Sequence, residues 1–279
     1  MDVARQTHFV NHYLAVSNIA MGTKKEPMAL IARSQGGAPR IDYLERWRNN
    51  AYPATGAIHS RYLAIFRKGR LRGTGILATA YHAADRSVSL SLWLPALRKI
   101  RRMGEPAQYD AWEGSIFTYG DVYLRKPEHE THEILGRTVF TDCAERMAFN
   151  ADPPAVLAYL DDACPMRGRE VIHLKSTALP PDEGPDLGYA WREQWIDAHT
   201  YADYRSVYYR DGKAFKRIDK DWRSMGLDDP RAQYTVLWYG LDMTTSLEGM
   251  ALLPARAVRW NLDLDANFWS ERSLRKIKR

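Results

Sequence analysis

The 279-residue sequence contains no hydrophobic run long enough to cross a membrane as a helix. Apolar runs such as residues 75–78 span a handful of residues, whereas a membrane helix needs about 20. Low-complexity, collagen and coiled-coil patterns are also absent, and 45% hydrophobic residues exclude a disordered chain. The composition therefore favours a globular protein of one or two domains, with enough core to fold without metals.

Cysteine is scarce, and the start of the chain lacks the features of a signal peptide. Residues 1–22 have no basic start, apolar stretch and small-residue cleavage site in succession. This fits either a cytoplasmic protein or an exported one whose signal has been removed. The two cysteines, Cys143 and Cys164, have no neighbours at metal-ligand spacing. From the residues alone they are either a disulfide, which implies an oxidising compartment, or two unrelated core thiols.

The hydrophobic pattern is mainly that of β-strands. Residues 88–94 alternate strictly between apolar and other side chains, and Asp211-Gly212 is a strong two-residue hairpin signal between two apolar stretches. Residues 42–50 show the spacing of a short helix, and Pro153 begins another at residues 153–160. The sequence therefore predicts an all-β fold with a few inserted helices.

Motifs for catalysis and metal binding are largely missing. There is no nucleophile elbow and no phosphate-binding loop, and residues 73–75 carry only two of the three glycines of a dinucleotide site. His129 and His132 are three positions apart, whereas a zinc helix of the H-E-x-x-H type needs four. If the protein is an enzyme, the acidic loop with Asp110, Glu113 and Asp121 is the first place to expect its site.

Positive charge is concentrated in one segment. Residues 59–103 contain ten basic residues and one acidic residue, although the whole chain has a net charge of only +6. Nucleic acid, an anionic membrane surface or an acidic protein would each fit such a segment, as would a simple solvated sheet face. Nucleic acid is not expected, because no nucleic-acid-binding motif is present and few aromatic residues lie among the basic ones.

Four phrases occur in a fixed order along the sequence. A strand ending in Trp93-Leu94-Pro95 precedes the basic residues 98–102 and a glycine- and aromatic-rich loop over residues 110–121. A hairpin phrase follows over residues 195–216, and the last phrase is FWSERSL, residues 268–274. In this order the phrases resemble the LolA-like family of outer-membrane lipoprotein-sorting proteins. The similarity runs from about residue 57 to the end, and it is to the broad relatives of the family rather than to the lipoprotein carrier itself.

The resemblance implies a mainly β fold, a LolA/LolB-like unclosed antiparallel β-barrel (a half-barrel) with a few covering helices. It separates an N-terminal extension with a short helix, residues 1–56, from a LolA-like β-domain, residues 57–279, with an insert near residues 144–169. It also favours a disulfide between Cys143 and Cys164, and a periplasmic protein whose signal peptide has been removed. No catalytic residue, cofactor or metal is implied.

The function implied by the resemblance is binding without chemistry. The protein would take a lipid, a lipoprotein acyl chain or another hydrophobic molecule into an apolar cavity and hand it between membrane partners, an inner-membrane lipid-exporting transporter being one candidate. Its contacts with membrane proteins would be peripheral. The alternative is a non-catalytic docking or accessory protein of a transporter complex, with a filled barrel. The expected cavity residues are Trp93, Trp112, Phe117, Trp195 and Tyr208, and the expected docking residues for an anionic partner or head group are Arg98, Lys99, Arg101 and Arg102.

Overall fold

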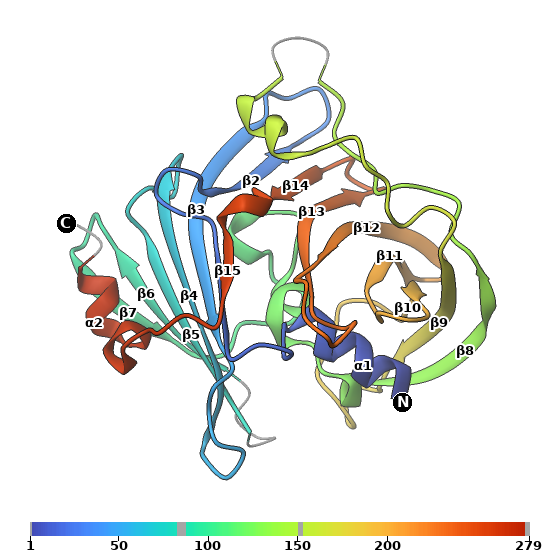
Figure 1. The fold of residues 1–279 in the computed structure, drawn as a ribbon, viewed down its shortest axis with the longest axis horizontal. Coiled ribbons are helices and arrows are strands. Elements are labelled where there is room, and N and C mark those ends of the chain that lie inside the picture. The colour runs from blue at the N-terminus through green and yellow to red at the C-terminus, as the bar shows by residue number, and fades with distance from the viewer. Residues whose placement is uncertain (1, 83–87, 150–152, 277–279) are drawn as a thin grey trace. The chain divides into compact units, whose positions relative to one another are not determined.

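The computed structural model describes residues 2–82, 88–149 and 153–276. Its strands form one large antiparallel sheet that is not closed into a barrel, so the predicted mainly β, unclosed architecture is confirmed (Figure 1). The chain separates into two compact units. Unit 1 comprises Met1–Ala15, Ile31–Pro39 and Ala107–Leu252, and unit 2 comprises Val16–Leu30, Arg40–Pro106 and Leu253–Arg279. Strand β2, Met28–Arg33, begins in unit 2 and ends in unit 1.

Unit 1 is an antiparallel meander that curls around the N-terminal helix. In sheet order its strands are β14 (Glu248–Leu252), β13 (Gln233–Asp242), β12 (Lys213–Ser224), β11 (Asp203–Arg210), β10 (Trp191–Asp197), β9 (Glu170–Ala178) and β8 (Glu130–Val139). Helix α1, Asp2–Asn11, packs its Ala4 against Leu174 and Ile196 (Figure 1). Asp211 and Gly212, both at positive φ, form the predicted two-residue hairpin between β11 and β12.

The connections of unit 1 contain short helical turns rather than long helices. These are η1 (Trp112–Gly114), η2 (Gly120–Leu124), η3 (Pro127–His129) and η4 (Ala155–Tyr159). The helix predicted from Pro153 is thus a 3-10 turn, with its preceding residues 150–152 outside the described part of the chain. Among the described residues, no helix is long and apolar enough to span a membrane.

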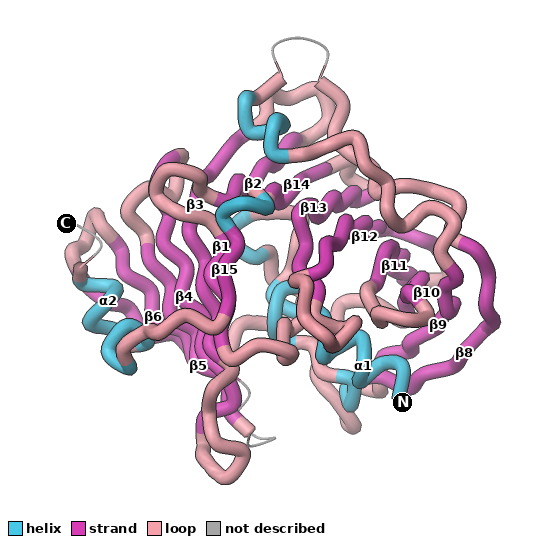
Figure 2. The backbone as a smooth tube through the Cα atoms, viewed as in Figure 1, coloured by secondary structure: helices cyan, strands magenta, loops and turns pink. Residues whose placement is uncertain are grey.

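The strands of unit 2 belong to the same antiparallel sheet and carry a short helical cover. Its strands follow the order β7 (Lys99–Met103), β6 (Val88–Leu94), β5 (Gly75–Tyr81), β4 (Ile58–Lys68) and β3 (Arg40–Asn49), and β1 (Asn18–Met21) pairs with both β3 and β15 (Val258–Trp260). The turn η5 (Ala255–Ala257) precedes β15, and η6 (Ala266–Trp269) and α2 (Glu271–Arg275) follow it (Figure 2). Together η6 and α2 contact β4, β5 and β6.

The helix predicted over residues 42–50 is wrong, because this segment is strand β3. Leu44 faces Phe66 in β4, and Trp47 faces Leu63 in β4 and Ala20 in β1. With strands on both sides, the backbone bonds of β3 are satisfied in the sheet, and this tertiary pairing overrides the weak helical spacing. Residues 18–49 thus supply strands, and the predicted boundary near residue 56 stays a prediction. Asp85 and Arg86 of the basic segment lie outside the described residues.

Candidate functional site

The cover of unit 2 is fixed by its caps and its apolar side chains. The side chain of Asp265 accepts a hydrogen bond from the backbone N–H of Asn267 and begins η6, and Ser270 in the same way caps α2. Trp269 and Leu274 are buried and pack in one cluster with β4, β5 and β6. That cluster consists of Leu63, Ile65, Leu77, Trp93, Trp269 and Leu274. The sequence-predicted cavity residue Trp93 is therefore part of the core beneath the cover.

A cavity of about 490 Å³ lies between β4 and this cover, and we call it the cover cavity. Its apolar lining comes from Leu63 and Ile65 of β4 and Phe268 of η6. Phe268 is held edge-on against Trp47, with ring centroids 5.4 Å apart. The remaining lining residues are polar or charged: Lys24, Arg67, Asp265, Asn267, Arg272, Ser273 and Lys276. The lining of the cover cavity thus combines an apolar part with a mostly basic part.

Glu271 ties the cover to the sheet beneath it. Its carboxylate accepts hydrogen bonds from Ser91 of β6 at 2.9 Å and from Arg102 of β7 at 2.7 and 3.0 Å. The hydrogen bond from Arg102 lowers the pKa of Glu271, against a small opposing effect of burial. Of the four predicted docking residues, Arg102 is therefore engaged within the molecule. Arg98, Lys99 and Arg101 are exposed at β7 and the turn before it.

Unit 1 contains a second cavity, of about 570 Å³, which we call the Tyr208 cavity. Ile116, Leu187, Phe215 and Leu247 supply apolar walls, and Tyr208, one of the five expected cavity residues, is also part of the lining. The other aromatic predictions do not meet there. Trp112 and Phe117 are buried, Phe117 edge-on to Trp238, and Trp195 stacks on His173 with ring centroids 4.6 Å apart. Their aromatic character makes these residues candidates for an interior position, but the sequence pattern does not show whether they line the same cavity.

The floor of the Tyr208 cavity is a buried ionic cluster that sequence reasoning missed. Asp121 accepts hydrogen bonds from Tyr208 at 2.8 Å and from the Thr118 hydroxyl at 2.9 Å, and it pairs with Lys216 and Arg125. Burial raises the pKa of Asp121, but Lys216 and Arg125 outweigh it and hold that pKa far below the usual range. Asp121 is one of the three acidic residues at which an enzyme site would first be expected. In the structure its carboxylate is buried and held by Tyr208, Thr118, Lys216 and Arg125.

Two further ion pairs fill the interior of unit 1. Glu130 accepts from Arg192 at 2.7 and 2.8 Å and from the Tyr189 hydroxyl at 2.7 Å. Lys220 of β12 donates to Asp203 at 2.8 and 3.0 Å and to Asn11 of α1 at 2.6 Å. Burial lowers the pKa of Lys220, opposed by Asp203. The inside of this curled sheet is thus occupied by α1 and by paired charges.

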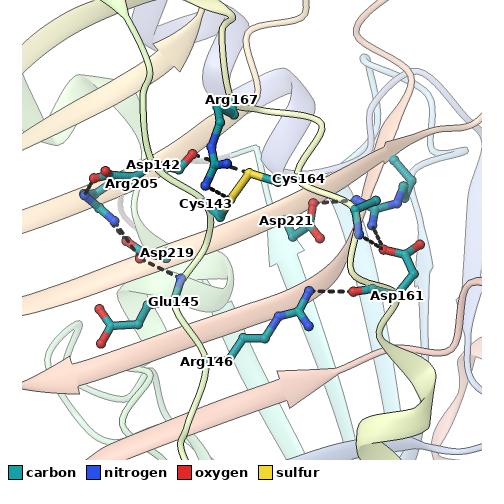
Figure 3. Close-up of a disulfide and its surroundings, with 12 residues drawn as sticks. Asp142, Cys143, Glu145, Arg146, Asp161, Cys164, Arg167, Arg205, Asp219 and Asp221 are labelled. Carbon is teal, nitrogen blue, oxygen red and sulfur yellow. Dashed lines mark hydrogen bonds and ion pairs between the residues drawn. A yellow bond between two sulfur atoms is a disulfide. The ribbon is translucent and has the colours of Figure 1, made fainter.

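The disulfide implied by the resemblance is present. Cys143 and Cys164 are bonded, with their Cα atoms 5.5 Å apart, and they join two stretches of the long connection between β8 and β9 (Figure 3). Arg205 of β11 bridges Asp142 of this connection, at 2.6 Å, and Asp219 of β12, at 2.8 Å (Figure 3). The disulfide therefore closes a loop within this connection, and the ion pairs of Arg205 with Asp142 and of Arg223 with Asp161 tie the connection to the meander.

Comparison with solved structures identifies the fold. A DUF1329 family protein from Desulfovibrio piger matches with a TM-score of 0.71 at 12% identity, covering 98% of each chain. An outer membrane lipoprotein-sorting protein domain from Vibrio parahaemolyticus matches with a TM-score of 0.68 at 17% identity, and a LolA superfamily protein from Nitrosomonas europaea with 0.58 at 9%. Both cover 98% of this chain and 97% of the other. The chain has a LolA-like fold.

Sequence comparison adds little to this LolA-like fold. A family profile described as "-like: Uncharacterized protein" matches residues 59–153, a segment that contains the whole basic stretch. No curated protein matches the sequence. The resemblance drawn from the four sequence phrases is thus confirmed at the level of the fold, by the structures rather than by relatives in sequence.

Proposed function

We propose that this LolA-like protein binds a hydrophobic molecule in the cover cavity and hands it between membrane partners, without catalysing a reaction. The observation that carries the proposal is the cavity of about 490 Å³ between β4 and the η6–α2 cover. Its size lies within the range of small-molecule sites, roughly 300–1,000 Å³. Its apolar side, Leu63, Ile65 and Phe268, would remove an acyl chain from water.

The energetics suit a carrier that must also release its cargo. Burying about ten methylenes would contribute roughly 8 kcal/mol, and the lost freedom of the bound molecule would subtract several kcal/mol. The cover is short, and it is held to the sheet by the buried Trp269 and Leu274, by the contacts of Glu271 and by a hydrogen bond from Arg61 of β4 to the carbonyl oxygen of Trp269. Entry and exit of the cargo would require part of these contacts to loosen.

We further propose that the protein works in the periplasm. The Cys143–Cys164 disulfide supports an oxidising compartment, and the similar domain from Vibrio parahaemolyticus is named for lipoprotein sorting at the outer membrane. A lipid-exporting transporter of the inner membrane is the partner class that this role would need.

A second candidate function is that of a docking protein, and unit 1 favours it. Part of its interior is occupied by α1 and the buried ion pairs rather than by open space. The exposed Arg98, Lys99 and Arg101 would then contact an acidic partner. This alternative predicts a protein that takes up no hydrophobic ligand in either unit.

Ligand retention and uptake test the proposal. Native mass spectrometry with organic extraction is expected to find a lipid or other hydrophobe bound near one per chain, and a fluorescent fatty acid is expected to bind the stripped protein. Ser273→Trp, which fills the cover cavity, should abolish uptake, whereas Thr244→Trp, at the Tyr208 cavity, should leave it unchanged. An apo mass without uptake would overturn the proposal, and loss of uptake in Thr244→Trp alone would move the site to unit 1.

A further inference from the structure

The cover cavity has an uneven distribution of charge. Four basic side chains line it, those of Lys24, Arg67, Arg272 and Lys276, but only one acidic side chain, that of Asp265. Arg67 already pairs with Glu45 of β3, so its charge is balanced inside unit 2. Within the described part of the chain, Lys24, Arg272 and Lys276 form no ion pair with a carboxylate within 4 Å.

Asp265 offsets only part of the positive charge that lines the cavity. Its carboxylate accepts the backbone N–H of Asn267 at 2.6 Å and caps η6. That hydrogen bond is the main cause that lowers the pKa of Asp265, with added contributions from Lys276 and Arg272. One negative charge therefore stands against the three positive charges of Lys24, Arg272 and Lys276.

The three cations come from two separate places in the sequence and meet at one cavity. Lys24 lies in the connection between β1 and β2, Arg272 lies in α2, and Lys276 directly follows α2. All three are exposed. Leu63, Ile65 and Phe268 supply the apolar part of the lining. A ligand that uses both parts needs an apolar chain and a negative head.

We propose that the cover cavity takes a single-chain amphiphile with an anionic head group, a carboxylate or a phosphate, and that Lys24, Arg272 and Lys276 bind this head. The inference rests on the proposed function and names its ligand class. A neutral lipid would leave the three cations without a partner. A free phosphate ion would leave the apolar part of the lining exposed to water. Only the amphiphile satisfies both halves of the lining.

The basic residues that the sequence singled out for a head group are in a different place. Arg98, Lys99 and Arg101 line neither the cover cavity nor the Tyr208 cavity. They are equally exposed and belong to the same unit. They therefore provide a matched control, since the same change of net charge can be made at β7 without touching the cavity.

The test compares two amphiphiles that carry the same acyl chain. One is lysophosphatidylglycerol, which is anionic, and the other is lysophosphatidylcholine, which is zwitterionic. Exposed ion pairs contribute about 0.2–1 kcal/mol each, so three should give the anionic ligand a roughly tenfold preference. This preference should shrink as salt is raised. Lys24→Glu/Arg272→Glu/Lys276→Glu should abolish it while binding of lysophosphatidylcholine stays within about twofold of the original. Arg98→Glu/Lys99→Glu/Arg101→Glu should retain it.

Each outcome bears on one claim. Equal affinity of the two amphiphiles for the unaltered protein would overturn the head-group assignment and leave the proposed function standing, whereas no binding of either would overturn the proposed function. Loss of the preference in the β7 control would show a general charge effect and overturn the assignment. If inorganic phosphate binds as tightly as the anionic amphiphile, the head-group assignment is overturned and the cavity is a site for free anions. If the glutamate set fails to fold, the glutamine set Lys24→Gln/Arg272→Gln/Lys276→Gln supplies the same comparison.

Discussion

Replacing Glu130 by glutamine should destabilise unit 1 severely, because it removes one half of a buried ion pair. The Glu130 side chain has 0% exposure and that of Arg192 has 10%. Burial would raise the pKa of Glu130, but Arg192 reverses this and lowers the pKa from 4.5 to about 2. This difference corresponds to about 3 kcal/mol of stability, and Glu130→Gln also leaves Arg192 buried without its counter-charge. We expect a loss of about 3 kcal/mol or more at pH 7.

The same pair dictates the direction of the pH dependence. The folded-state pKa of Glu130 is below its ordinary value, so the stabilisation is complete above about pH 5 and is lost as the pH falls from 4.5 towards 2. Urea unfolding at pH 7 and at pH 3, with hydrogen exchange of peptides from β9 and β10, measures both effects. The difference in the free energy of unfolding between pH 7 and pH 3 should be smaller in Glu130→Gln than in the unaltered protein.

Glu128→Gln is the matched control for this prediction. Glu128 pairs with Arg5 at 3.7 Å, but the two side chains are 57% and 62% exposed, so the change should cost less than about 1 kcal/mol. The reasoning fails if Glu130→Gln costs no more than Glu128→Gln. It also fails if the two variants keep the same pH profile, since the charge of Glu130 would then contribute nothing to the fold.

Three further substitutions probe other parts of the structure. Replacing Cys143 and Cys164 by serine should cost about 3 kcal/mol for a bridge spanning 21 residues, seen as a lower urea midpoint that reductant no longer changes. Gly69→Ala should lower the melting temperature more than Gly212→Ala. Both glycines have positive φ, but a Cβ at Gly69 would lie 2.4 Å from a backbone carbonyl oxygen in β3, whereas a Cβ at Gly212 would meet open space. Glu271→Ala should cost less than about 1 kcal/mol of stability yet accelerate ligand release several-fold in stopped flow, and unchanged release would show that the cover is held by its apolar anchors alone.

The fold could be read from the sequence where its strands show a clean pattern. Strand β6 has the alternating sequence of a strand, although its burial alternates only from Val88 to Ser91. Asp211-Gly212 is a turn whose two positive φ angles favour such residues. The pattern failed at β3, because Glu45 and Arg46 are buried beside Leu44 and hide the alternation of a strand. It also missed α1, whose buried residues Ala4, Thr7 and Val10 do not form a broad apolar stripe.

The site was less predictable, because it depends on which side chains of distant segments meet. Trp93 is large, apolar and on a strand, which favours an inward position, and it belongs to the core under the cover. Nothing in its own stretch of sequence shows that a C-terminal turn covers it. Arg102 is an exposed cation as the sequence indicates, yet its partner Glu271 lies 169 residues further along the chain. Such a pairing follows from topology alone.

The closing phrase FWSERSL, which carried part of the family resemblance, acquires a physical meaning residue by residue. Phe268 lines the cover cavity, while Trp269 and Leu274 anchor the cover in the core of unit 2. Glu271 holds the cover to β6 and β7, and Arg272 lines the cavity with its charge. This short segment thus lines the cavity, buries two apolar side chains in the core, forms hydrogen bonds to the sheet and supplies a positive charge. Because these roles are separable, changing Glu271 should alter how fast a ligand leaves, whereas changing Arg272 should alter which head group is preferred.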